Sequence, residues 1–258
     1  MCHNPDALPA VPRDRSIDVE VERITLHAAD RSTFSAISAR PPLTARVGVV
    51  ILPDNRGLSS FYGELACRIA ELGHCAVAID YFGRTAGTED RSQDFPFMEH
   101  LMKLTRPGLE ADFAAAVRFL LSDGGCACSR IFALGFCFGG RQAYLAATLG
   151  HRLSGVMGFY GFPGTIMGAP GPTERAADIS SPVLAIWAGA DDITAEQIDT
   201  FTSALNAAHV EHESVVYPGA PHSFFDLRQA EYQEVSRDAW RRVRAFIDRN
   251  GNAPNRPA

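Results

Sequence analysis

One cysteine lies where the chain could activate a nucleophile. Cys137 is at the centre of the segment GFCFGG (135–140), which separates an apolar run from a helical pattern. A nucleophile between a strand and a helix needs a sharp, strained turn, and glycines two residues before and after it remove side chains that would clash. The N-terminus of the following helix favours thiolate over thiol. We therefore expect Cys137 to be the nucleophile and the N–H of Phe138 to be an oxyanion donor, although a buried cysteine in a tight turn has the same pattern.

A cysteine nucleophile needs a base that takes its proton and an acid that orients the base. In enzymes with this turn the chain order is nucleophile, acid, histidine. Asp191 and Asp192 follow the apolar run 182–188, and His222 follows the run 212–217, so candidates occur in this order. The sequence predicts a triad of Cys137, His222 and Asp191. Either aspartate could face the histidine, and we expect the other one to cap the next helix.

Apolar runs alternate with helical patterns along the chain, and this alternation predicts the fold. The expected strands are 19–26, 34–38, 46–52, 75–80, 130–135, 153–160, 182–188 and 212–217. The expected helices are 58–72, 97–104, 109–121, 140–149, 195–208 and 228–249. Such alternation indicates an α/β class with a mostly parallel central sheet and helices on both faces, as in the α/β-hydrolase fold. We expect a flexible N-terminal arm (1–15), a single domain (16–250) and a polar tail (251–258).

The sequence resembles the dienelactone hydrolase family over residues 18–248. The resemblance rests on GFCFGG (135–140), GAD (189–191) and HSF (222–224), and on PDNRG (53–57) and DYFGR (80–84). It implies a hydrolase that cleaves a lactone or a carboxylic ester. It further implies that Asp54 modulates the nucleophile and that Asn55 gives a second oxyanion N–H. Tyr81 and Arg84 would lie near the substrate, with Arg84 binding an anionic group.

The chain departs from the family at two of these positions. The family has glutamate where this chain has Asp54, which is one methylene shorter, so its reach to the thiol is in question. A second family arginine falls on Asp226, and the nearest arginine is Arg228. Asp54 could instead cap the helix that starts near residue 58, and Arg84 could be a surface arginine.

Several aromatic residues follow the expected strands or lie in the loops between them. We expect Tyr160 and Phe224 to line an apolar substrate pocket, although either could belong to the core. His222 is one of eight histidines, and the others, His3 among them, are expected to be mostly solvated surface residues. Enzymes of the glutaminase or protease type with a flavodoxin-like fold usually have glutamate two residues after the histidine, where this chain has Phe224.

Composition limits the expected cellular location and the expected classes of binding partner. The net charge of -6 gives no broad attraction for nucleic acid or anionic lipid, and no apolar stretch is long enough for a membrane helix. Six cysteines and no visible export signal favour reduced thiols in a cytoplasmic protein. Cys126 and Cys128 are too close together and too isolated for a zinc site, so we expect them to be loop or strand-edge thiols and expect no metal or cofactor. The expected partner is a small ester or lactone bound by a monomer or homodimer. The alternative is a non-catalytic scaffold of the same fold that binds a ligand or a partner.

Overall fold

The computed structural model describes residue 3, residues 6–89, residue 91 and residues 94–252. Eight strands form one sheet in the order β1-β2-β4-β3-β5-β6-β7-β8. The strands are β1 (Glu20–His27), β2 (Thr33–Arg40), β3 (Val47–Leu52), β4 (Cys75–Ile79), β5 (Arg130–Phe136), β6 (Gly155–Phe159), β7 (Val183–Ala190) and β8 (His212–Pro221). Strand β2 pairs antiparallel with β1 and with β4, and all other pairs are parallel. The expected mostly parallel sheet is confirmed.

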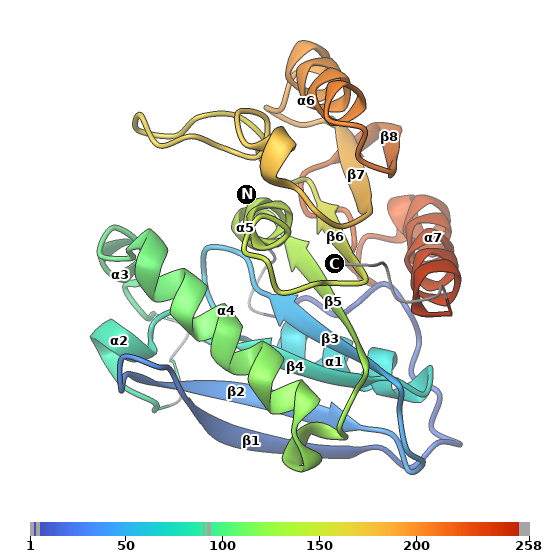
Figure 1. Cartoon of the computed structure of the whole chain (residues 1–258). Helices are drawn as coiled ribbons and strands as arrows, with labels where there is room; N and C mark the ends of the chain where they lie inside the picture. Colours follow the sequence, from blue (N-terminus) through green and yellow to red (C-terminus); the bar gives the residue numbers. More distant parts are fainter. Residues whose placement is uncertain (1–2, 4–5, 90, 92–93, 253–258) are drawn as a thin grey trace.

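Helices cover both faces of this sheet (Figure 1). The helices are α1 (Ser60–Glu71), α2 (Gly83–Ala86), α3 (Phe97–Leu101), α4 (Arg106–Leu121), α5 (Phe138–Ala146), α6 (Ala195–Ala207) and α7 (Gln233–Gly251). Short 3₁₀ turns lie at Asp123–Gly125, Ala176–Asp178 and Ala230–Tyr232. Side chains of α4, α5 and α6 share one apolar cluster, and those of α1 and α7 share a second. The alternation along the strands therefore fills two cores.

Strand β3 shows why the central runs are continuously apolar. All six of its residues are buried. Val50 and Leu52 join the cluster beneath α4 and α5, whereas Val49 and Ile51 join the cluster beneath α1 and α7. Successive strand residues point to opposite faces, so a strand covered on both faces must be apolar at every position. The carboxyl ends of β3, β5, β6, β7 and β8 consequently meet at one edge of the sheet, where polar loops carry the expected site residues.

The N-terminal arm differs from the expectation of a flexible segment. In its described part, residues 3 and 6–15, His3, Ala7 and Ala10 are buried. The backbone of Leu8 is hydrogen-bonded in both directions to the loop after β8, and the guanidinium of Arg68 on α1 donates to the carbonyl of Val11. The segment is polar and rich in proline, yet it packs against the body because its few small apolar residues fill gaps between α1 and that loop. The expected C-terminal tail lies largely outside the described residues.

Two cysteines depart from the expectation of reduced thiols. Cys75, at the start of β4, forms a disulfide with Cys126, which follows α4. Cys67 and Cys128 are buried outside any disulfide. The expectation was therefore wrong for the pair 75–126, and this disulfide removes the thiol-based reason for a cytoplasmic assignment. Within the described residues, no helix is both long and apolar enough to span a bilayer.

Candidate active site

The turn between β5 and α5 holds Cys137 in a strained conformation. Cys137 has φ 55° and ψ −116°, a region that a residue with a side chain rarely adopts. The flanking glycines make the turn possible: a Cβ on Gly135 would lie 1.9 Å from the carbonyl oxygen of Gly139. A Cβ on Gly139 would lie 2.0 Å from the carbonyl oxygen of Leu52. The spacing of glycines therefore reflects close backbone approach, as the sequence predicted.

The same turn places the cysteine at the start of a helix. Cys137 is the N-cap of α5, and its carbonyl accepts from the N–H of Arg141 at 3.2 Å. The N–H groups of the first helical turn, beginning with Phe138, have no partner four residues earlier in the helix. Such groups carry partial positive charge and favour an anion beside them. The half-buried Cys137 side chain is thus set where a thiolate would be stabilised.

His222 follows β8, and its ring is held by a carboxylate from the end of β7. The Nδ1 atom of His222 lies 2.7 Å from Oδ2 of Asp191, and the two side chains are 16% and 6% exposed. The Nε2 atom of His222 is buried and has no hydrogen-bond partner among the described residues. With Nδ1 committed to the carboxylate, Nε2 is the atom left to exchange a proton with another group.

The structure distinguishes the two adjacent aspartates. Asp191 faces the histidine, whereas Asp192 is exposed and its N–H donates to Oδ1 of Asp191 at 2.7 Å. We had expected the second aspartate to cap α6, but Asp192 does not do so. The N-cap of that helix is Thr194, which forms a reciprocal capping box with Gln197.

Tyr160 connects the cysteine turn with the histidine. It follows β6 with φ 39°, and its ring centroid lies 4.6 Å from that of His222. The preceding residue, Phe159, accepts the N–H of Cys137 at 3.0 Å. The adjacent strands β5, β6, β7 and β8 thus bring Cys137, Tyr160, Asp191 and His222 to one edge of the sheet.

Asp54 and Asn55 lie in the turn after β3. Oδ1 of Asp54 accepts the N–H of Arg56 at 2.9 Å, and Oδ2 accepts the N–H of His3 at 3.1 Å. Burial raises the pKa of Asp54, and these two N–H groups partly oppose that rise. Asp54 does not cap α1, whose N-cap is Ser59.

Asp54 and Cys137 both lie near two buried phenols. The pKa values of Tyr62 and Tyr81 are raised well above the usual range, mainly by burial and further by the charges of Asp54 and Cys137. Both groups are therefore within electrostatic reach of the same two phenols.

Arg84 is engaged by carboxylates of two other segments. Its Nε and Nη2 atoms donate to the two carboxylate oxygens of Asp112 on α4, at 3.0 and 2.7 Å. Its Nη1 atom contacts Asp30 and donates to Ser32. These carboxylates raise the pKa of Arg84. The guanidinium therefore joins α2 to α4 and to the β1–β2 turn.

Tyr81 and Phe224 are buried more deeply than the expected lining of a substrate pocket. The Tyr81 hydroxyl donates to the carbonyl of Pro53 at 3.0 Å, and its ring packs edge-on against Phe138. Tyr81 also borders a cavity of about 30 Å³ between α4 and α5. Phe224 is fully buried against Tyr160 and other rings, which favours the core alternative for this residue.

Sequence reasoning missed His3, which had been expected at the surface. Its ring is buried beside Tyr160, and its Nε2 lies 2.9 Å from the Tyr160 hydroxyl. No periodicity or motif surrounds His3 in the sequence, because the arm is placed by tertiary contacts alone. No signal short of the three-dimensional structure could have located it.

Comparisons with known proteins relate this chain to one family. The model of the dienelactone hydrolase family matches residues 34–250. A carboxymethylenebutenolidase from Rhodococcus opacus is 29% identical over 259 residues, covering 96% of this chain and 97% of that protein. A crystal structure of a "Putative Dienelactone Hydrolase" from Klebsiella pneumoniae is 25% identical, has a TM-score of 0.79, and covers 90% of this chain and 99% of that one. An acylaminoacyl peptidase from Pyrococcus horikoshii shares the α/β-hydrolase fold, with 15% identity and a TM-score of 0.70. The match covers 93% of this chain and 43% of the peptidase. This chain therefore belongs to the dienelactone hydrolase family and is a hydrolase related to carboxymethylenebutenolidases.

Proposed function

We propose that this protein hydrolyses a lactone or carboxylic ester through a Cys137–His222–Asp191 triad. The observation that carries the proposal is the histidine, whose Nδ1 is held by Asp191 while its buried Nε2 has no partner within the described part of the chain. An imidazole held in this way is oriented as a general base. The strained turn after β5, which is separated from β7 by β6 alone, supplies the Cys137 thiol on which that base would act.

The reaction follows from these positions. His222 removes the thiol proton, and the sulfur of Cys137 attacks the carbonyl carbon. The tetrahedral intermediate collapses to a thioester as the C–O bond breaks, and the leaving alkoxide takes the proton from His222. His222 then deprotonates a water that attacks the thioester, which releases the acid and returns the proton to sulfur. In a lactone the leaving alcohol stays attached to the acyl chain.

The oxyanion formed in each step needs hydrogen-bond donors. We assign this role to the N–H groups of Phe138 and Asn55, which begin α5 and follow β3. Loss of one such donor typically costs about 3 kcal/mol of transition-state stabilisation. We assign to Asp54 the modulation of the thiol, because its pKa is raised by burial and its charge is felt by the same tyrosines as that of Cys137.

The relatives support a class of substrate, but they do not indicate whether the substrate is charged. The name carboxymethylenebutenolidase of the Rhodococcus opacus relative supports a lactone. The expected anion contact, Arg84, is engaged by Asp112 and Asp30. We therefore propose a small lactone or ester whose recognition does not depend on Arg84.

Two neighbouring aspartates provide a matched test of the triad. Asp191→Asn should lower kcat on an activated ester on the order of 10²–10⁴-fold, because the imidazole loses its orientation and charge partner. Asp192→Asn, one residue away and exposed, should change kcat less than about twofold. Cys137→Ala should abolish turnover with an unchanged melting temperature. Equal losses in the two aspartate variants, or turnover by the alanine variant, would overturn the proposal.

A further inference from the structure

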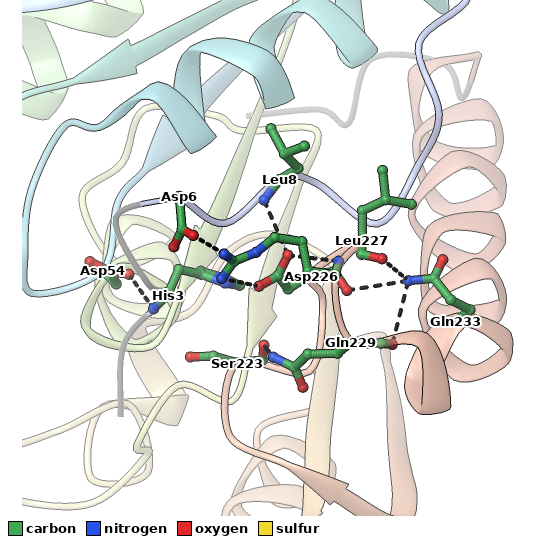
Figure 2. A network of polar contacts seen from close by, with 10 residues as sticks. His3, Asp6, Leu8, Asp54, Ser223, Asp226, Leu227, Gln229 and Gln233 are labelled. Atoms are coloured by element: carbon green, nitrogen blue, oxygen red, sulfur yellow. Dashed lines mark hydrogen bonds and ion pairs between the residues drawn. The ribbon is translucent and has the colours of Figure 1, made fainter.

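The N-terminal arm joins two loops of the candidate active site. At one end, the N–H of His3 donates to Asp54 in the turn after β3. At the other end, the N–H of Leu8 donates to Oδ1 of Asp226 at 3.1 Å, and the N–H of Leu227 donates back to the carbonyl of Leu8 at 2.8 Å. Figure 2 shows both attachments, His3 with Asp54 and Leu8 with Asp226.

An ion pair strengthens the second attachment. The guanidinium of Arg228 contacts the carboxylate of Asp6 and lies 3.5 Å from Oδ2 of Asp226. Asp226 is buried, and Oδ1 of its carboxylate also accepts the N–H of Arg228. A buried carboxylate that accepts main-chain N–H groups from two segments fixes those segments relative to one another. The arm is therefore attached to the loop that carries the histidine.

The side chain of His3 is enclosed between these two attachments. Its ring stacks on Phe61 with a centroid distance of 4.0 Å and meets Phe136 edge-on at 5.9 Å. Its Nε2 lies 2.9 Å from the hydroxyl of Tyr160, a bond between two buried groups. A buried phenol needs a hydrogen-bond partner, and a stacked imidazole is a rigid one.

Tyr160 transmits this contact to the candidate base. The Tyr160 ring packs on the ring of His222 with a centroid distance of 4.6 Å, so His3 and His222 lie at different parts of one tyrosine. Burial and the nearby charge of His222 lower the pKa of His3 to about 3. His3 is therefore neutral near pH 7, and a charge that forms on His222 during proton transfer meets no second cation there.

We propose that His3 is a positioning residue of the hydrolytic site, which holds the Tyr160 hydroxyl and thereby fixes the ring against which His222 packs. The inference rests on the proposed function, because it gives His222 the role of base. Nothing in the catalytic steps requires His3 to touch the substrate. Its contribution is the placement of the base, and misplacement by about 1 Å can cost on the order of 10²-fold in rate.

The test separates the hydrogen bond from packing. His3→Leu fills the space without a polar atom, and His3→Gln restores one near the position of Nε2. We expect His3→Leu to lower kcat about 10-fold with KM within about twofold, and His3→Gln to recover kcat to within about threefold. Tyr160→Phe deletes the other end of the bond and should match His3→Leu, and the double variant should be no worse than either. Arg13→Ala, on the same arm but paired with Glu71, should leave kcat unchanged.

Each outcome decides between the possibilities. Wild-type kcat in His3→Leu, equal losses in the Leu and Gln variants, or additive losses in the double variant would overturn the positioning role. If His3→Leu does not fold, as judged by its melting curve, Tyr160→Phe alone carries the test, and wild-type kcat in that variant overturns the role. Cys137→Ala measured in parallel separates the two proposals. Turnover without the thiol means that the proposed function fails, whereas thiol-dependent turnover that ignores His3 means that only this inference fails.

Discussion

Lowering the pH from 7 to 5 should weaken the docking of the N-terminal arm through His3. The pKa of this histidine is about 3 in the folded chain, against 6.5 when it is exposed. The docked form therefore binds fewer protons, so its stability is complete above pH 6.5 and is lost as the pH falls towards 3. The linkage relation gives a loss of about 1.9 kcal/mol between pH 7 and pH 5, equivalent to about 25-fold in the docking equilibrium.

Hydrogen exchange measures this equilibrium directly. Amides of the arm, such as that of Leu8, which donates to Asp226, should lose about 25-fold in protection at pH 5 after correction for the intrinsic rate. The charged groups facing His3 are Asp54 and His222. Burial raises the pKa of Asp54, so protonation of Asp54 acts in the opposite direction. His3→Gln keeps Asp54 and removes only the histidine, so the difference between the two proteins isolates His3. Equal pH dependence of arm protection in wild type and His3→Gln would refute the reasoning.

Three further predictions concern stability. Cys126→Ser, which removes the disulfide, should lower the free energy of unfolding by about 2–4 kcal/mol in urea, and dithiothreitol should have no further effect on this variant. Gly139→Ala should lower the free energy of unfolding by about 3 kcal/mol, because its Cβ would lie 2.0 Å from a backbone oxygen. Gly124→Ala, whose Cβ would lie 3.7 Å from the nearest atom, should lower it by under about 1 kcal/mol. Arg84→Ala should cost about 3 kcal/mol in urea unfolding because it leaves the buried Asp112 unpaired, while KM for both neutral and anionic esters should stay within about twofold. A large rise in KM for the anionic ester alone would instead assign substrate recognition to Arg84.

Hydrophobic pattern was sufficient to predict most of the fold. The runs at 46–52 and 182–188 are continuously apolar because the strands that they form are buried on both faces, and both became central parallel strands. The exact end of a strand was harder to predict. Strand β8 continues to Pro221, beyond the expected end at 217, because a register shift at Ala188 and Ala190 keeps it paired with β7. This extension carries the chain to His222, and it depends on pairing that no local pattern encodes.

The candidate site was predictable wherever residue type and backbone geometry coincide. The glycines around Cys137 mark close approaches of backbone, and the pairing of Asp191 with His222 agrees with their order along the chain. Charge partners were not predictable. Arg84 matches a family position by sequence, yet Asp112 on a distant helix binds its guanidinium. The burial of His3 likewise depends on contacts across most of the chain, such as that with Tyr160.

The central claim is that the sulfur of Cys137 carries the acyl group during turnover. Rapid quenching of a slowly hydrolysed ester, followed by digestion and mass spectrometry, would locate that group. The account predicts an acyl mass on the peptide that contains Cys137, removed by hydroxylamine as a thioester is, and absent from Cys137→Ala. Hydrolysis that proceeds with the acyl group on another residue, or with no acylated Cys137 at any time, would contradict it.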